Sequence, residues 1–163
     1  MANRIAVLVV EDSEADAGVM LGELRTGGFD PRHERVEDAL GLDGAIGKAP
    51  WDIVLLDYNM PRMSAERALI RLRERIPDVP VIVVSAFVGE EAVVGLMKAG
   101  AADYVPKDKL RRLCPAVERA LSEAAVRRNM ARAEETNRKL LREMQTILDN
   151  LPAIAFRKDR SSR

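Results

Sequence analysis

Short, unbroken runs of apolar and β-branched residues recur along the chain, separated by segments long enough to form a helix. The runs are Ile5 to Val10, Ile53 to Leu56, Val79 to Val84 and the brief Asp103 to Val105, with a weaker candidate from Phe29 to Val36. An unbroken apolar run, unlike an alternating one, indicates a strand buried on both faces, as in a parallel sheet covered by helices. Five β-α units predict a doubly wound α/β fold, a (βα)5 parallel five-stranded sheet with right-handed crossovers.

The segments between the runs carry recognisable helix signals. Glu14 to Thr26 has an apolar face and ends at Gly27-Gly28, which suits a left-handed helix C-terminus. Ser64 is expected to cap a helix through Arg75, and Glu90 to Ala99 forms another, closed by Gly100. Glu37 to Lys48 is expected to be short or irregular because its three glycines each cost about 1 kcal/mol in a helix interior.

No helix breaker lies between Pro115 and Pro152, which predicts a fifth helix extended well beyond the sheet's needs. Its first part is expected to pack on the sheet through Leu113, Val117, Ala120, Leu121 and Ala124. Beyond it, residues spaced by four and three form a heptad seam: Val126, Met130, Ala133, Asn137, Leu140, Met144, Ile147 and Leu151. Asn137 falls on an a-type position and favours a parallel homodimer. The alternatives are an amphipathic helix that folds back onto its own domain, a monomeric helix that frays, and, because Leu141 and Leu148 widen the stripe, a larger bundle.

These patterns divide the 163 residues into a globular domain over 1–124, a coiled-coil linker helix over 125–151 and a tail over 152–163. Lys plus Arg (26) balances Asp plus Glu (26), so no net charge attracts nucleic acid or an anionic membrane surface, and neither is expected as a partner. No apolar stretch approaches the roughly 18 to 20 residues of a membrane span. The single cysteine, Cys114, fits a reducing cytoplasmic location.

Polar residues stand where four of the predicted strands end. Glu11 and Asp12 follow the first strand, Asp57 the third, Ser85 the fourth and Lys107 the fifth. In a doubly wound sheet, ligands bind beyond the carboxyl ends of the strands, so these groups are expected to converge. Three carboxylates together repel one another unless a hard cation sits among them, and Mg²⁺ is the obvious candidate. Such a cation, an ammonium and a hydroxyl would neutralise a transferring phosphoryl group.

Four motifs resemble the receiver domain of two-component response regulators, over roughly residues 4–124. They are Val9-Val10-Glu11-Asp12-Ser13, the run ending at Asp57 with Met60-Pro61 behind it, Val84-Ser85-Ala86, and Gly100 to Lys107. The resemblance implies strand order 2-1-3-4-5 and a phosphoacceptor signalling domain rather than a conventional enzyme. Its partner would be a sensor histidine kinase or phosphotransfer protein.

The resemblance also implies a role for each residue of the predicted site. Asp57 would take the phosphoryl group, and Asp12, Asp57 and the backbone carbonyl of Asn59 would ligate Mg²⁺, with Glu11 holding a water in the second shell. Ser85 and Lys107 would contact the phosphoryl oxygens. Tyr104 would change rotamer together with Ser85, altering the surface of the fourth and fifth helices and the linker helix. Two positions depart from the family's common pattern: Asp108 stands where many receivers have proline, and Arg62 where glycine is common.

Three other functions share part of this pattern. A phosphatase of the haloacid-dehalogenase kind expects a second acid two residues after the nucleophile, where this chain has Asn59. A flavodoxin-like binder needs a hydroxyl- and glycine-rich loop after the first strand, where acids stand here. A phosphorylation-independent dimerisation module is the remaining alternative. At the far end, residues 147–156 resemble the entry into a PAS sensory domain, so the chain is expected to be a piece of a longer protein.

Overall fold

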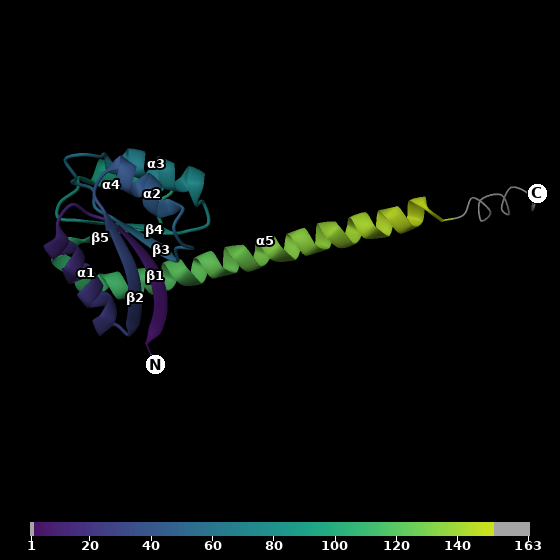
Figure 1. Ribbon diagram of the computed structural model, residues 1–163, viewed down its shortest axis with the longest axis horizontal. Helices are drawn as coiled ribbons and strands as arrows, with labels where there is room; N and C mark the ends of the chain where they lie inside the picture. The colour runs from purple at the N-terminus through teal and green to yellow at the C-terminus, as the bar shows by residue number, and fades with distance from the viewer. Residues whose placement is uncertain (1, 152–163) are drawn as a thin grey trace, which may run out of the picture. The chain divides into compact units, whose positions relative to one another are not determined.

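A computed structural model describes residues 2–151 and contains one five-stranded sheet and five α-helices (Figure 1). In chain order the elements are β1 (Asn3–Val10), α1 (Glu14–Thr26), β2 (Phe29–Val36), α2 (Ala39–Ile46), β3 (Ile53–Leu56), α3 (Ala65–Arg75), β4 (Val81–Ser85), α4 (Glu90–Lys98), β5 (Asp103–Pro106), the 3-10 helix η1 (Lys107–Arg112) and α5 (Leu113–Asp149). All neighbouring strands are parallel, in the order β2-β1-β3-β4-β5. The predicted fold class and strand order are confirmed.

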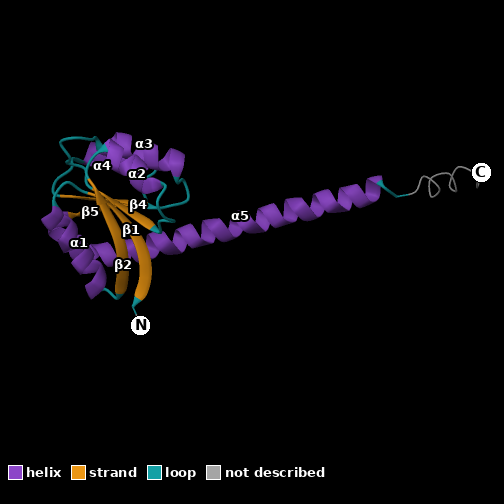
Figure 2. Ribbon diagram, viewed as in Figure 1, coloured by secondary structure: helices purple, strands orange, loops and turns teal. Residues whose placement is uncertain are grey.

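Both faces of the sheet are buried, which explains the unbroken apolar runs. In β1, Ala6, Leu8 and Val10 belong to one core cluster, whereas the alternate residues of the strand belong to the other. Side chains from α2, α3 and α4 fill the first cluster, and those of α1 and the start of α5 fill the second. Figure 2 shows α2, α3 and α4 over one face of the orange sheet and α1 over the other.

The strand β2 gave the weakest sequence signal because it lies at the edge of the sheet. Its side chains are not continuously buried: Phe29, Pro31 and Val36 are inside, whereas Asp30, Arg32 and His33 are exposed. Pro31 has no N–H to donate, and an edge strand tolerates this because only one of its sides is hydrogen-bonded in the sheet. Edge position therefore accounts for the polar residues that interrupt this run.

Helix ends follow the predicted caps, with small shifts. The side chains of Ser13 and Ser64 accept hydrogen bonds from the backbone N–H groups of Asp16 and Arg67, at 3.1 and 3.2 Å. Positive φ angles occur at Gly28 (97°) and Gly100 (111°), each two residues beyond the last residue of α1 or α4. The helix expected over Glu37 to Lys48 is shorter, Ala39–Ile46, because the Asp38 side chain caps it by accepting the Gly41 N–H at 2.7 Å.

The strand predicted from Val79 instead runs from Val81 to Ser85. Val79 donates its N–H to the carbonyl of Ile76, which keeps it in the turn after α3, and Pro80 follows it. Trp51 is buried before β3 and donates its indole N–H to the Ala45 carbonyl at 2.8 Å. This contact ties the end of α2 to the start of β3.

Helix α5 is continuous over 37 residues. The contacts within the chain divide the chain into two compact units, Met1–Ala125 and Val126–Arg163. In the first unit, Leu113, Ala116, Val117, Ala120 and Ala124 are buried; Ala116 was not predicted, and Leu121 is only half-buried. In the second unit every described side chain is exposed. None of the helices within residues 2–151 has the length and hydrophobicity that a membrane span requires. The tail over 152–163, with half of the segment that resembles a PAS entry, lies outside the described residues.

Candidate functional site

Three carboxylates meet at the carboxyl edge of the sheet. Glu11 and Asp12 follow β1, and Asp57 follows β3, whose last residue pairs with Val10 of β1. One oxygen from each carboxylate lies within 4.8 Å of the others. Glu11 and Asp57 are 1% and 3% exposed, whereas Asp12 is open to solvent. Two buried acids beside an exposed one form a cluster that must be neutralised by a proton or a cation.

Lys107 reaches this cluster from the end of β5. Its ammonium donates to Glu11 Oε2 at 2.9 Å and to Asp16 Oδ2 at 2.8 Å, and lies 3.7 Å from Asp57 Oδ2. Burial lowers the pKa of Lys107, but its hydrogen bonds to Asp16 and Glu11 and the charge of Asp57 outweigh burial and raise that pKa to about 12. The lysine is therefore a fixed positive charge between α1 and the two buried acids.

Glu11 is held from several sides. Its backbone N–H donates to the Val36 carbonyl at 3.0 Å, and its Oε1 accepts the backbone N–H of Ser13 at 3.1 Å. Burial raises the pKa of the Glu11 carboxyl to about 7, and the negative charge of Asp57 adds to this, against the hydrogen bonds from Lys107 and Ser13. A cation bound among these acids would oppose that rise, because it favours the charged carboxylate.

Ser85 ends β4 and is fully buried. Its hydroxyl oxygen accepts a hydrogen bond from the side-chain amide of Asn59 at 3.1 Å, and the same amide lies 3.4 Å from the carbonyl of Phe87. The backbone N–H of Asn59 donates to Asp57 Oδ1 at 3.3 Å. Asn59 was predicted only for its backbone carbonyl; its side chain, which joins the loops after β3 and β4, was missed because sequence spacing does not show which way an amide points.

Tyr104 lies on β5 opposite Val83 of β4, two residues before Ser85. The ring is partly buried against the core cluster that α2, α3 and α4 cover. Burial raises the pKa of its hydroxyl, and the charge of Asp108 raises it further. The position is next to the site, and the predicted rotamer change of Tyr104 stays a prediction.

The donors at this edge suit Mg²⁺. Mg²⁺ prefers oxygen ligands and takes one or two carboxylates while retaining waters, and Asp12, exposed beside buried Asp57, leaves room for such waters. Sulfur and imidazole are absent from the described cluster, which disfavours zinc. The acids thus fit a hard divalent cation.

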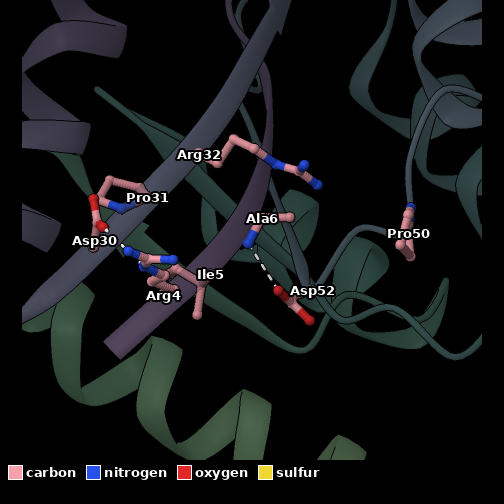
Figure 3. A pocket seen from close by; sticks show the side chains of 8 residues that line it. All are labelled: Arg4, Ile5, Ala6, Asp30, Pro31, Arg32, Pro50 and Asp52. Carbon is pink, nitrogen blue, oxygen red and sulfur yellow. Dashed lines mark hydrogen bonds and ion pairs between the residues drawn. The ribbon is translucent and has the colours of Figure 1, made fainter. Parts of the chain in front are cut away.

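The opposite edge of the sheet carries a separate pocket of about 540 Å³ (Figure 3). Its lining comes from the amino ends of β1 and β2 and from the segment before β3: Arg4, Ile5, Ala6, Asp30, Pro31, Arg32, Pro50 and Asp52. Asp52 accepts the Ala6 N–H at 2.7 Å, and the exposed Arg4 pairs with Asp30 at 3.7 Å. None of the acids described above lines this pocket, so it is distinct from the site at the carboxyl edge.

Comparison with known proteins agrees with this geometry. Residues 7–118 match the family model described as response regulator receiver domain. The chain is 35% identical over 112 residues to a protein-glutamate methylesterase/protein-glutamine glutaminase of Pyrococcus horikoshii, covering 66% of this chain and 29% of that protein. It is 42% identical over 103 residues to the sensory transduction protein RegX3 of Mycobacterium bovis, covering 63% and 44%. The chain thus spans less than half the length of either relative.

Solved structures show the same fold. NtrX of Brucella abortus superposes with a TM-score of 0.71 at 27% identity, covering 80% of this chain and 30% of that chain. The signal receiver domain of a Luxo repressor protein from Vibrio parahaemolyticus superposes with a TM-score of 0.66 at 27% identity, covering 78% and 97%.

Proposed function

Because this chain belongs to the response regulator receiver domain family, we propose that Asp57 accepts a phosphoryl group from the phosphohistidine of a sensor histidine kinase or phosphotransfer protein. The observation that carries the proposal is the setting of Asp57. Its buried carboxylate lies within 4.8 Å of two other acids and 3.7 Å from the Lys107 ammonium, at the end of a central strand. A switch of this kind is a signalling domain, whose only turnover is at its own aspartate.

In the proposed step, an oxygen of Asp57 forms a bond to phosphorus while the P–N bond of the donor's phosphohistidine breaks. Negative charge spreads over the phosphoryl oxygens, and groups already in place must stabilise it. Lys107 supplies a positive charge, and the Ser85 hydroxyl, held by Asn59, can donate to a phosphoryl oxygen. Because Asp57 is nearly buried, these interactions act in a medium less polar than water and are stronger for it.

Asp12, Asp57 and the backbone carbonyl of Asn59 would hold Mg²⁺, and Glu11 would bind one of its waters. When bound, this cation neutralises the acids and the incoming phosphoryl oxygens. The chain's own contribution is to keep the three carboxylates together in a site that a donor can reach through exposed Asp12.

The proposed response is a coupled change at Ser85 and Tyr104 that alters the surface of α4 and α5. Ser85 and Tyr104 lie on adjacent strands, and the residues after Ser85 lead directly into α4. Since α5 is continuous from Leu113 to Asp149, a change in its first turns can be passed along it. This supports coupling between the site and the second unit.

We further propose that the second unit pairs with a second copy of itself as a parallel coiled coil, over 125–151. Six apolar side chains of the seam are 50% to 64% exposed: Val126, Met130, Leu140, Met144, Ile147 and Leu151. Such a continuous exposed stripe indicates an interaction surface. Ala133 and Asn137 complete the seam, and a buried Asn at an a position favours two parallel strands.

Incorporation of phosphate from acetyl phosphate, followed by intact mass, tests the phosphoacceptor. A Mg²⁺-dependent adduct is expected on wild type and on Asp78→Asn, which removes an exposed acid at the opposite edge of the sheet, and is expected to be lost in Asp57→Asn. A folded wild-type protein that takes no phosphate from acetyl phosphate or from a phosphorylated kinase would contradict the proposal. That result would favour the alternative, a dimerisation module that works without phosphorylation.

A further inference from the structure

Lys107 closes a ring of hydrogen bonds at the start of α1. The backbone N–H of Ser13 donates to Glu11 Oε1, and the Ser13 hydroxyl oxygen accepts the backbone N–H of Asp16, both at 3.1 Å. Asp16 Oδ2 and Glu11 Oε2 then accept from the Lys107 ammonium at 2.8 and 2.9 Å. The helix cap thereby fixes the backbone of Asp16 and brings its carboxylate to the lysine.

We propose that Asp16 is a positioning residue that anchors Lys107 in the unphosphorylated domain, and that Lys107 exchanges this contact for one with a phosphoryl group on Asp57. This inference rests on the proposed function. The ammonium lies 2.8 Å from Asp16 Oδ2 but 3.7 Å from Asp57 Oδ2, so its resting contacts are with α1 and Glu11.

Burial decides which of the two contacts Lys107 gives up. The Asp16 side chain is 48% exposed, so water can replace the ammonium at its carboxylate. The Glu11 side chain is 1% exposed, and removing the lysine would leave a buried carboxylate without a counter-charge. Lys107 therefore keeps Glu11 and exchanges Asp16 for the phosphoryl oxygens, and the strength of the Asp16 contact opposes phosphorylation.

The test compares Asp16→Asn with Glu14→Gln, which removes an equal charge from the same exposed first turn of α1. The first readout is acetylation of Lys107 by acetic anhydride without metal, measured by peptide mass relative to exposed Lys109. The second is the initial rate of phosphorylation by acetyl phosphate at saturating Mg²⁺. Asp16→Glu keeps the charge and is expected to restore the wild-type values of both.

Asp16→Asn is expected to raise the Lys107 to Lys109 ratio and the phosphorylation rate about two- to fivefold, the size typical of one ion pair with a solvated partner. Glu14→Gln is expected to change neither. Equal effects of the two variants, or an unchanged Lys107 to Lys109 ratio in Asp16→Asn, would contradict the proposal that Asp16 anchors Lys107. A raised acetylation ratio without a faster rate would contradict the claim that the Asp16 contact slows phosphorylation. If wild type takes no phosphate, the proposed function fails, and the acetylation ratio still tests whether Asp16 anchors Lys107.

Discussion

Glu11 should make the metal-free domain less stable as the pH rises. Its folded pKa is raised from 4.5 to about 7, chiefly by burial, so the folded state binds a proton that the unfolded state has released. The stabilising contribution is fully present below pH 4.5 and is lost as the pH rises through 7. At about 1.4 kcal/mol per pKa unit, the whole shift corresponds to up to about 3 kcal/mol of unfolding free energy.

Urea unfolding of wild type and Glu11→Gln, from pH 4 to pH 8 in a chelator, isolates this contribution because other groups titrate in both proteins. Wild type is expected to lose stability relative to the variant, mostly between pH 5 and 7. The exposed Glu14→Gln serves as the control for removing a charge and should run parallel to wild type.

Saturating Mg²⁺ should abolish the loss of stability of wild type relative to Glu11→Gln, because a cation among the acids favours the charged carboxylate. A constant difference between wild type and Glu11→Gln across this range, without metal, would refute the argument that burial governs Glu11.

Two further substitutions test the fold and the second unit. Gly100→Ala should cost more than about 1 kcal/mol by urea unfolding, because φ is 111° there and a Cβ would lie 2.9 Å from Arg73 Nε; Gly44→Ala, in α2 with open space around it, should instead gain about 0.5 to 1 kcal/mol. Asn137→Leu should tighten self-association in sedimentation equilibrium and allow larger assemblies, whereas the same change at outward-facing Lys139 should not. If wild type and the Asn137→Leu variant are both monomeric, the result would count against the seam.

Much of the fold could be predicted from the sequence because a strand that is buried on both faces of the sheet appears as an unbroken run of apolar residues. The runs Ile53–Leu56 and Phe29–Val36 are strands with those bounds, and the order of elements follows from the spacing. Boundaries were less accurate where a side chain or a turn decides them. Asp38 shortens α2 by capping it, and the Val79 N–H bonded to Ile76 delays β4.

The convergence of the acids could be predicted for a different reason. Parallel strands present their carboxyl ends at one edge, so Glu11, Asp57 and Lys107 meet there whatever their loops do. This rule predicts at which strand end a residue lies, but it does not predict the positions of the side-chain atoms. It could not show that the Asn59 amide holds the Ser85 hydroxyl, since that depends on a side-chain rotamer in the loop after β3.

Asp16 illustrates the same limit and its consequence. It follows no strand, and in sequence it resembles any acid in the first turn of a helix, where such residues stabilise the helix dipole. In the structure, the Ser13 cap holds the backbone of Asp16, and the Asp16 carboxylate lies 2.8 Å from the Lys107 ammonium. Residues at strand ends thus define which groups share the site, while a residue on a neighbouring helix decides where the lysine rests. The contacts that hold the lysine in the unphosphorylated domain therefore include a residue in the helix that follows the strand-end motif.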